Sequence, residues 1–290
     1  MHFVDAKGIL SGSGGYYGMN LYRGCSHGCI YCDSRSACYQ FTHPFEDIEV
    51  KRNAPELLEA ALRSKRRPCM IGTGSMSDPY MHCEESLRLT RRCLELLLRY
   101  GFGAAIQTKS DRILQDIELL DAINRKARCV VQMTLTTWDD ELCGIVEPNV
   151  CSTKRRVEVL AELQRRGIPT VVWLCPILPF LNDTEENIRA ILDACVRTGV
   201  KGVICFGMGL TLRDGDREYY YAALDRHFPG LKQEYIARYG TAYELPSPNA
   251  ERLMALFTDI CRENGILCTP EECFAFIREF PERYEQLSMF

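Results

Sequence analysis

Three closely spaced cysteines are the residues of this sequence best suited to chemistry. They follow the spacing Cys25-x3-Cys29-x2-Cys32, and Gly24 and Gly28 beside them allow the backbone to fold tightly around a small object. Three thiolates from one short loop can bind three irons of a [4Fe–4S] cube and leave the fourth iron open to another ligand. The loop therefore predicts an iron–sulfur site.

Zinc is the alternative metal for this loop, with Cys38 or His27 as a fourth ligand, because closed structural zinc sites have four ligands. The chain has 16 cysteines and its first residues lack a basic-then-apolar signal peptide, so disulfides are the weaker explanation. A second group is spaced too widely for the same kind of loop, and buried thiols are expected there: Cys261, Cys268 and Cys273.

Composition restricts the class of protein. The chain has 290 residues, 46% hydrophobic residues and a formal charge of −4, which allows one large domain or two small ones. No apolar run approaches the roughly 18 residues that a membrane helix needs. The acidic balance lacks the basic footprint of a duplex-DNA binder. We therefore expect a soluble, cytoplasmic protein without a membrane partner.

Short apolar runs alternate with helical patterns and must position the cysteine loop. Six runs bounded by polar or Gly/Pro residues are typical of buried parallel strands, and five amphipathic segments separate most of them. The expected strands are Gly18–Tyr22, Cys69–Gly72, Gly103–Thr108, Cys129–Leu135, Thr170–Cys175 and Val200–Phe206. The expected helices are Pro55–Lys65, Cys83–Tyr100, Arg112–Ala127, Thr153–Arg166 and Thr184–Thr198.

Six βα-type units in one run predict an α/β fold with a parallel sheet curled into a partial (βα)6 TIM-type barrel. An open, doubly wound sheet is the alternative. After residue 206 the pattern becomes helical, so we expect a core barrel over residues 1–210 and a helical C-terminal extension over 211–290 packed on it. The expected helices of this extension are Arg217–His227, Leu231–Tyr239 and Asn249–Asn264.

The cysteine loop resembles the signature of the radical S-adenosylmethionine (SAM) enzymes, because an aromatic residue, Tyr31, precedes the third cysteine. Four further segments are similar to the spore photoproduct lyase-like branch of that superfamily, and the resemblance extends over roughly residues 16–207. These segments are Ser77–Tyr80, Gln107–Ser110, Glu147-Pro148 and Pro176–Pro179.

The resemblance implies a [4Fe–4S] cluster on Cys25, Cys29 and Cys32, with SAM bound to the open iron. An electron from a flavodoxin- or ferredoxin-type donor cleaves SAM, and the resulting 5′-deoxyadenosyl radical removes a hydrogen atom from the substrate. In such enzymes the cofactor supplies the difficult chemistry, while the protein binds, orients and excludes water. Active sites of such barrels lie at the carboxyl ends of the strands.

The resemblance also assigns the contacts to SAM. Lys109, at the end of a strand, matches the lysine that binds the SAM carboxylate. Gly74 and Ser77 match the loop that receives the SAM ammonium. Thr134 matches a position beside the ribose or methionine portion, and Tyr31 is expected beside the adenine.

Four residues are expected on the substrate side as catalytic candidates: Ser75, Asp78, Tyr80 and Glu147. Asp78 could instead cap a turn, and Glu147 could pair with an arginine such as Arg155. Spore photoproduct lyase carries its hydrogen-donor cysteine where this chain has Ser75. Because an alcohol O–H bond is too strong to quench a carbon radical, repair of a thymine photodimer by that route is not expected. Cys38 is the residue that could replace this donor.

The last five residues, Gln286–Phe290, resemble the peptide by which bacterial repair and replication proteins dock on the sliding clamp. A terminal peptide with apolar anchors suits insertion into a partner's groove, although it could also pack on its own domain.

The leading hypothesis is a radical SAM lyase-like enzyme that abstracts a hydrogen atom, with a nucleic-acid lesion or nucleotide as the favoured substrate. A peptide or small-molecule substrate is the alternative within this class. A non-catalytic metal-binding or clamp-associated protein is the alternative outside it.

Overall fold

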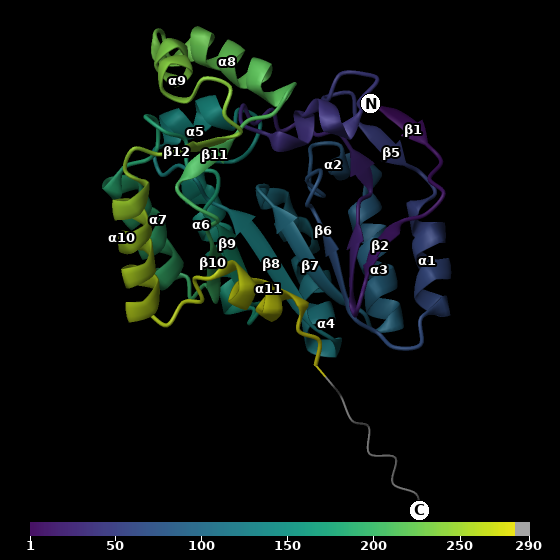
Figure 1. Ribbon diagram of the computed structural model, residues 1–290. Coiled ribbons are helices and arrows are strands. Elements are labelled where there is room, and N and C mark those ends of the chain that lie inside the picture. Colours follow the sequence, from purple (N-terminus) through teal and green to yellow (C-terminus); the bar gives the residue numbers. More distant parts are fainter. Residues whose placement is uncertain (282–290) are drawn as a thin grey trace, which may run out of the picture.

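The structure, a computed structural model, describes residues 1–281 and is built around one seven-stranded sheet (Figure 1). The strand order is β10-β9-β8-β7-β6-β3-β2, and all neighbours are parallel except β2, which runs antiparallel to β3 at the edge. The strands are β2 (Leu10–Ser13), β3 (Tyr16–Met19), β6 (Met70–Thr73), β7 (Gly103–Thr108), β8 (Cys129–Thr134), β9 (Thr170–Trp173) and β10 (Gly202–Ile204).

The six parallel strands lie side by side in the order in which they occur along the chain. This order has no reversal, so the alternative of a doubly wound sheet is wrong and the predicted partial barrel is confirmed. The expected first strand differs, because the chain leaves the main sheet after Met19. Its continuation is β4 (Tyr22–Arg23), which joins β1 (His2–Val4) and β5 (Glu49–Lys51) in a separate small sheet.

Helices cover the outer face of the barrel, against side chains such as Ala104, Ile106 and Val131. The expected helix over residues 83–100 is interrupted at Arg88, whose φ is 47°, where the Glu84 carboxylate accepts a hydrogen bond from the Thr90 backbone. The helices are α1 (Ala54–Ser64), α2 (Glu84–Leu87), α3 (Leu89–Tyr100), α4 (Ile117–Lys126), α5 (Asp140–Val146), α6 (Thr153–Arg165) and α7 (Glu185–Arg197). Three short 3₁₀ helices also occur: η1 (Asp33–Arg35), η2 (Ala37–Tyr39) and η3 (Asp111–Asp116).

The C-terminal extension crosses the mouth of the barrel and then enters its concave face. Its last helix packs Cys273 and Ile277 against inward-facing strand residues such as Val130 and Ile204, so it completes the barrel core (Figure 1). The sequence patterns did not indicate this helix or the small β-ribbon before it. The elements are β11 (Gly209–Thr211), α8 (Asp216–His227), α9 (Leu231–Tyr239), β12 (Glu244–Pro246), α10 (Ala250–Glu263) and α11 (Pro270–Arg278).

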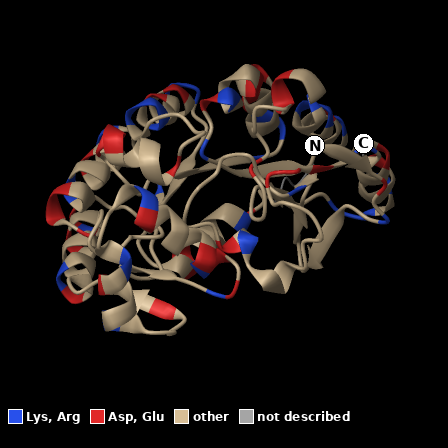
Figure 2. Ribbon diagram, turned by 90° about the horizontal axis from the view of Figure 1, so that it is seen from above, with Lys and Arg blue, Asp and Glu red and all other residues tan. Residues whose placement is uncertain are grey.

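The surface carries both signs of charge, and Figure 2 shows Lys/Arg and Asp/Glu interspersed over the outer helices. Among residues 1–281, no helix is long and apolar enough to cross a membrane. The segment Gln286–Phe290 lies outside the described residues, so its docking on a sliding clamp stays a prediction.

Candidate active site

The cysteine loop depends on two glycines with left-handed backbone. Gly24 has φ 86°, and a Cβ added there would lie 2.4 Å from the carbonyl oxygen of Phe45, which also accepts a hydrogen bond from the Cys25 backbone. Gly28 has φ 73°, and its added Cβ would lie 3.1 Å from the Asn149 side chain. These close approaches hold the loop over the barrel mouth and leave no room for a larger residue at position 24.

The three loop cysteines line one cavity of about 100 Å³ at the carboxyl ends of β6–β8. Within residues 1–281, only His2, His43 and Glu49 form a triple of potential ligand atoms all within 4.8 Å of one another. Because Zn–S bonds are about 2.3 Å long, thiolates on one zinc lie within about 4.6 Å of each other. The three loop cysteines do not form such a triple; they line one hollow, as the expected cluster site requires.

The two candidates for a fourth zinc ligand lie in different places. Cys38 is exposed and its sulfur lies 3.6 Å from a guanidinium nitrogen of Arg213, away from the cavity lining. Cys38 lines neither cavity at the mouth, and its role as a relocated hydrogen donor stays a prediction. His27 lines the cavity beside the three cysteines.

Gly74 allows the loop after β6 to approach the end of β7 closely. Its φ is 101°, and an added Cβ would lie 1.9 Å from the carbonyl oxygen of Gln107. Ser77 is buried and its hydroxyl donates to the Tyr22 carbonyl at 3.0 Å, while Ser75 is exposed and lines the cysteine cavity. Gly74, Ser75 and Ser77, which are expected at SAM-contact and hydrogen-donor positions, therefore line the same hollow.

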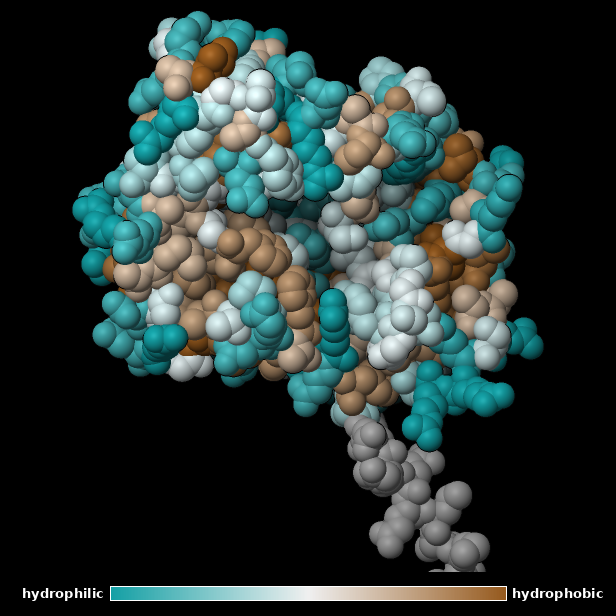
Figure 3. Space-filling view, viewed as in Figure 1, coloured by the Kyte–Doolittle hydropathy of each residue, from teal (hydrophilic) through white to brown (hydrophobic). Residues whose placement is uncertain are grey.

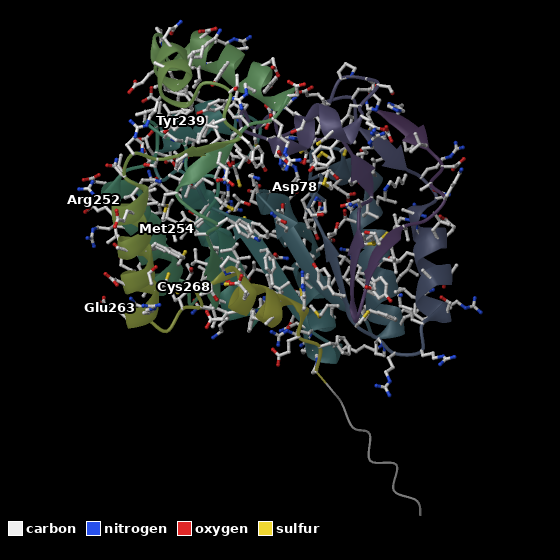
Figure 4. All side chains as sticks on the ribbon, in the orientation of Figure 1. Asp78, Tyr239, Arg252, Met254, Glu263 and Cys268 are labelled. Atoms are coloured by element: carbon white, nitrogen blue, oxygen red, sulfur yellow. The ribbon has the colours of Figure 1, made fainter. Side chains whose placement is uncertain are left out.

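Asp78 is a buried connector between two strand ends (Figure 4). Its carboxylate accepts hydrogen bonds from the Tyr80 backbone at 2.8 Å, the Thr108 hydroxyl at 2.7 Å and the Lys109 backbone at 2.7 Å. Tyr80 is fully buried, lines neither cavity at the mouth and donates to Asp116 at 3.1 Å. Asp78 thus joins two strand ends and lines the cysteine cavity, whereas Tyr80 lies in the core and lines neither cavity.

Lys109 directs its ammonium into the site, 6.0 Å from the centre of the Tyr31 ring. Burial opposes its charge, but the negative charges of Cys29 and Glu147 raise the pKa of Lys109 above its usual value. Lys109 and Thr134 line both the cysteine cavity and the larger cavity beside it. A permanent cation at this junction suits a carboxylate ligand.

Glu147 is buried beneath the site and orients Tyr31, whose hydroxyl donates to it. Its partner is Arg156, 2.5 Å away, rather than the expected Arg155, which pairs with Asp111 on the surface. Burial alone would raise the pKa of Glu147, but Arg156 and Lys109 lower it below its usual value. The carboxylate therefore supports the site from below instead of facing substrate.

A second cavity of about 720 Å³ continues from the first toward the C-terminal extension. Figure 3 shows the surface hollowed near the centre of this face, and Met254 on α10 marks the far side in Figure 4. The two cavities share Cys32, Gln107, Lys109 and Thr134. The outer cavity adds residues that sequence reasoning did not identify: Trp173, Cys175, Phe206, Met208, Glu244, Glu251 and Met254.

Some of these cavity residues could have been identified from the sequence. Trp173, Cys175 and Phe206 lie at or just beyond the ends of β9 and β10, where barrel enzymes place their sites. Glu244 and Glu251 could not have been identified in this way, because only the folding of the C-terminal extension brings them to the cavity.

The fold and the cysteine loop together define a class of protein, and comparison with known families identifies that class. Residues 19–188 match the radical SAM superfamily, and the chain belongs to that superfamily. Its cofactors are a [4Fe–4S] cluster and SAM. The observed site fits them, since three thiols surround one hollow and a buried histidine nitrogen there lacks a protein partner.

Relatives of known sequence extend the likeness beyond the barrel. An uncharacterized protein of Mycobacterium tuberculosis is 30% identical over 244 residues, which is 82% of this chain and 71% of the relative. A radical SAM Nα-GlyT isomerase of Pseudomonas phage M6 is 23% identical over 180 residues, 62% of this chain and 36% of the relative.

Solved structures show the same fold. A spore photoproduct lyase variant with bound dinucleoside spore photoproduct superposes with a TM-score of 0.64 at 14% identity, covering 92% of this chain and 80% of that one.

Proposed function

We propose that this chain cleaves SAM reductively and abstracts a hydrogen atom from a substrate bound in the outer cavity. Cys25, Cys29 and Cys32 would hold the cluster. When bound, the cluster and SAM supply the one-electron cleavage and the hydrogen abstraction. The remaining residues bind, orient and exclude water around these cofactors.

Several side chains are placed to hold SAM. The Lys109 ammonium would bind the SAM carboxylate, and the glycine-bent loop from Gly74 to Ser77 would present backbone groups to its amino end. Thr134, at the boundary of the two cavities, would contact the ribose or methionine portion. Tyr31, fixed by its hydrogen bond to Glu147, would form one side of the adenine site.

One observation carries this proposal: the cysteine cavity adjoins the larger one, and the two share four lining residues. A reactive species formed beside the cysteines would therefore lie next to a substrate bound in the larger cavity. The Asp78 hydrogen bonds keep the two strand ends at this junction together.

The favoured substrate is a nucleobase, in a nucleotide or a nucleic-acid lesion. Trp173 and Phe206 line the cavity, and Phe206 is 63% exposed, so aromatic surface is available there for stacking on a base. Glu244 and Glu251, which line the same cavity, would accept hydrogen bonds from base N–H groups and disfavour a phosphate there. The dinucleoside ligand of the structural relative supports the same substrate class.

Repair of a photodimer through a thiol at position 75 does not belong to this proposal, because Ser75 has no S–H bond. A one-electron donor of the flavodoxin or ferredoxin type would supply the electron.

The test is an anaerobic preparation reconstituted with iron and sulfide, then incubated with SAM and reductant. We expect about four irons and four sulfides per chain and formation of 5′-deoxyadenosine and methionine. A preparation that holds zinc and leaves SAM intact would contradict the proposal.

A further inference from the structure

His27 is the side chain at the cysteine cavity whose chemistry is still unassigned. It lies between two of the cluster cysteines in the chain, is only 2% exposed, and lines the same cavity of about 100 Å³. Its ring nitrogen Nε2 is buried and has no hydrogen-bond partner in the protein. Buried polar groups nearly always have partners, so this nitrogen calls for one inside the cavity.

The protein around His27 does not supply that partner. Nδ1 lies 3.5 Å from the Asp78 carboxylate, which is longer than an ordinary hydrogen bond. Asp78 already accepts three hydrogen bonds, from Tyr80, Thr108 and Lys109. This carboxylate can hold the ring in place from the Nδ1 side, while Nε2 stays without a partner in the protein.

A second histidine shows the ordinary arrangement. His43 has its Nδ1 3.0 Å from the Pro44 carbonyl and its Nε2 2.8 Å from Glu49, so both ring nitrogens are matched by protein atoms. Arg23 also donates to Glu49. The contrast indicates that the unmatched nitrogen of His27 belongs to the cofactor site.

We propose that His27 donates a hydrogen bond from Nε2 to a sulfur of the [4Fe–4S] cluster and thereby raises the cluster's reduction potential. The inference rests on the proposed cofactor site. Apart from its irons, a cluster presents thiolate and sulfide sulfurs, which accept hydrogen bonds. One-electron reduction adds negative charge to these sulfurs, so a donor stabilises the reduced state more than the oxidised state. His27 is thus a positioning and tuning residue.

The test is an anaerobic redox titration of the reconstituted, SAM-free protein, followed by electron paramagnetic resonance of the reduced cluster. His27→Leu should lower the equilibrium constant for reduction about tenfold, which corresponds to about 59 mV for one electron. His27→Gln keeps an N–H donor and should recover part of the loss. The control is His227→Leu, exposed on α8, which should match wild type. If the equilibrium constant for reduction of His27→Leu lies within about twofold of the wild-type constant, the inference is overturned.

A second measurement decides the matter if His27→Leu fails to hold a cluster. Wild-type protein with isotopically labelled histidine should show weak coupling between one ring nitrogen and the reduced cluster, with an exchangeable proton between them. No coupling, or the strong coupling of a nitrogen bound directly to iron, would overturn the inference. Iron, sulfide and 5′-deoxyadenosine are assayed on the same samples. If these are present while the potential is unchanged, the tuning role is wrong and the proposed function stands.

Discussion

The mouth of the barrel has two sides of different construction. The cysteine side, formed by the loop at residues 24–32 and the ends of β6–β8, carries buried polar groups such as Asp78 and Glu147, each with several hydrogen-bond partners. The extension side, formed by β9, β10, β12 and α10, presents Trp173, Phe206 and Met254 to an open cavity. A network of satisfied polar groups favours one fixed arrangement, whereas an open apolar surface suits a ligand that must enter and leave. We therefore assign cofactor chemistry to the cysteine side and substrate binding to the extension side.

The largest effect is expected from the cluster cysteines. Changing Cys25, Cys29 or Cys32 to Ala removes one of three thiolates and should abolish the iron–sulfur absorption and 5′-deoxyadenosine formation. Cys195→Ala, in the buried face of α7, is the matched control and should retain both. Equal loss in the control would mean that the cysteine side is not where the cluster resides.

The buried ion pair below the site should dominate stability on this side. Arg156→Met leaves the Glu147 carboxylate buried without its guanidinium and should lower the free energy of unfolding by about 3–5 kcal/mol. Arg155→Met, one residue earlier but exposed, should change it by less than about 0.5 kcal/mol. Anaerobic denaturant unfolding measures the free energy of unfolding of both variants. If the two variants lose similar amounts, the buried ion pair does not stabilise the protein more than the surface pair does.

Truncation on the extension side should affect substrate and spare the cofactors. Phe206→Ala removes a stacking face worth about 1–3 kcal/mol, so nucleotide binding should weaken about 5- to 150-fold. SAM cleavage without substrate should keep its wild-type rate. Phe3→Ala, 52% exposed and remote on β1, is the control for loss of a surface aromatic. A parallel loss of SAM cleavage in Phe206→Ala would contradict the division between the two sides.

The smallest effect concerns Asp216, at the start of α8 where the extension meets the cysteine side. Burial raises its pKa to about 6, although the Arg213 backbone donates to it at 2.6 Å. The folded state thus binds this proton more tightly than the unfolded state, and stability is lost as pH rises through about 6. Asp216→Asn should be more stable than wild type by about 1–2 kcal/mol at pH 8, with a smaller gain at pH 5. A gain that is the same at both pH values would show that burial of the charge is not its cause.

The sequence indicated many of the residues that line the cysteine cavity because their signals are local, while the roles of these residues stay predictions. Cys25, Cys29 and Cys32 lie in one loop, and Lys109 and Thr134 lie at the ends of strands whose apolar runs are easily identified. Arg156 was missed in favour of Arg155, although helix periodicity places Arg156 on the same face as the buried Val159 and Leu160.

The extension side was harder because it is assembled from distant segments. Glu244 follows helix α9, and Glu251 lies in the first turn of α10; only the fold brings either residue to the ends of β9 and β10. The helix over residues 270–278 was missed entirely, and it supplies part of the barrel core.

Deuterium transfer tests the central claim most directly, because it joins the two sides in one event. The reconstituted protein, SAM and reductant are incubated with perdeuterated nucleosides, nucleotides and short oligonucleotides, and 5′-deoxyadenosine is analysed by mass spectrometry. We predict deuterium in 5′-deoxyadenosine with at least one base-containing substrate, and its loss in Phe206→Ala under subsaturating substrate. Abundant 5′-deoxyadenosine that never acquires deuterium from this substrate class, while a peptide or other small molecule does transfer it, would contradict the assignment.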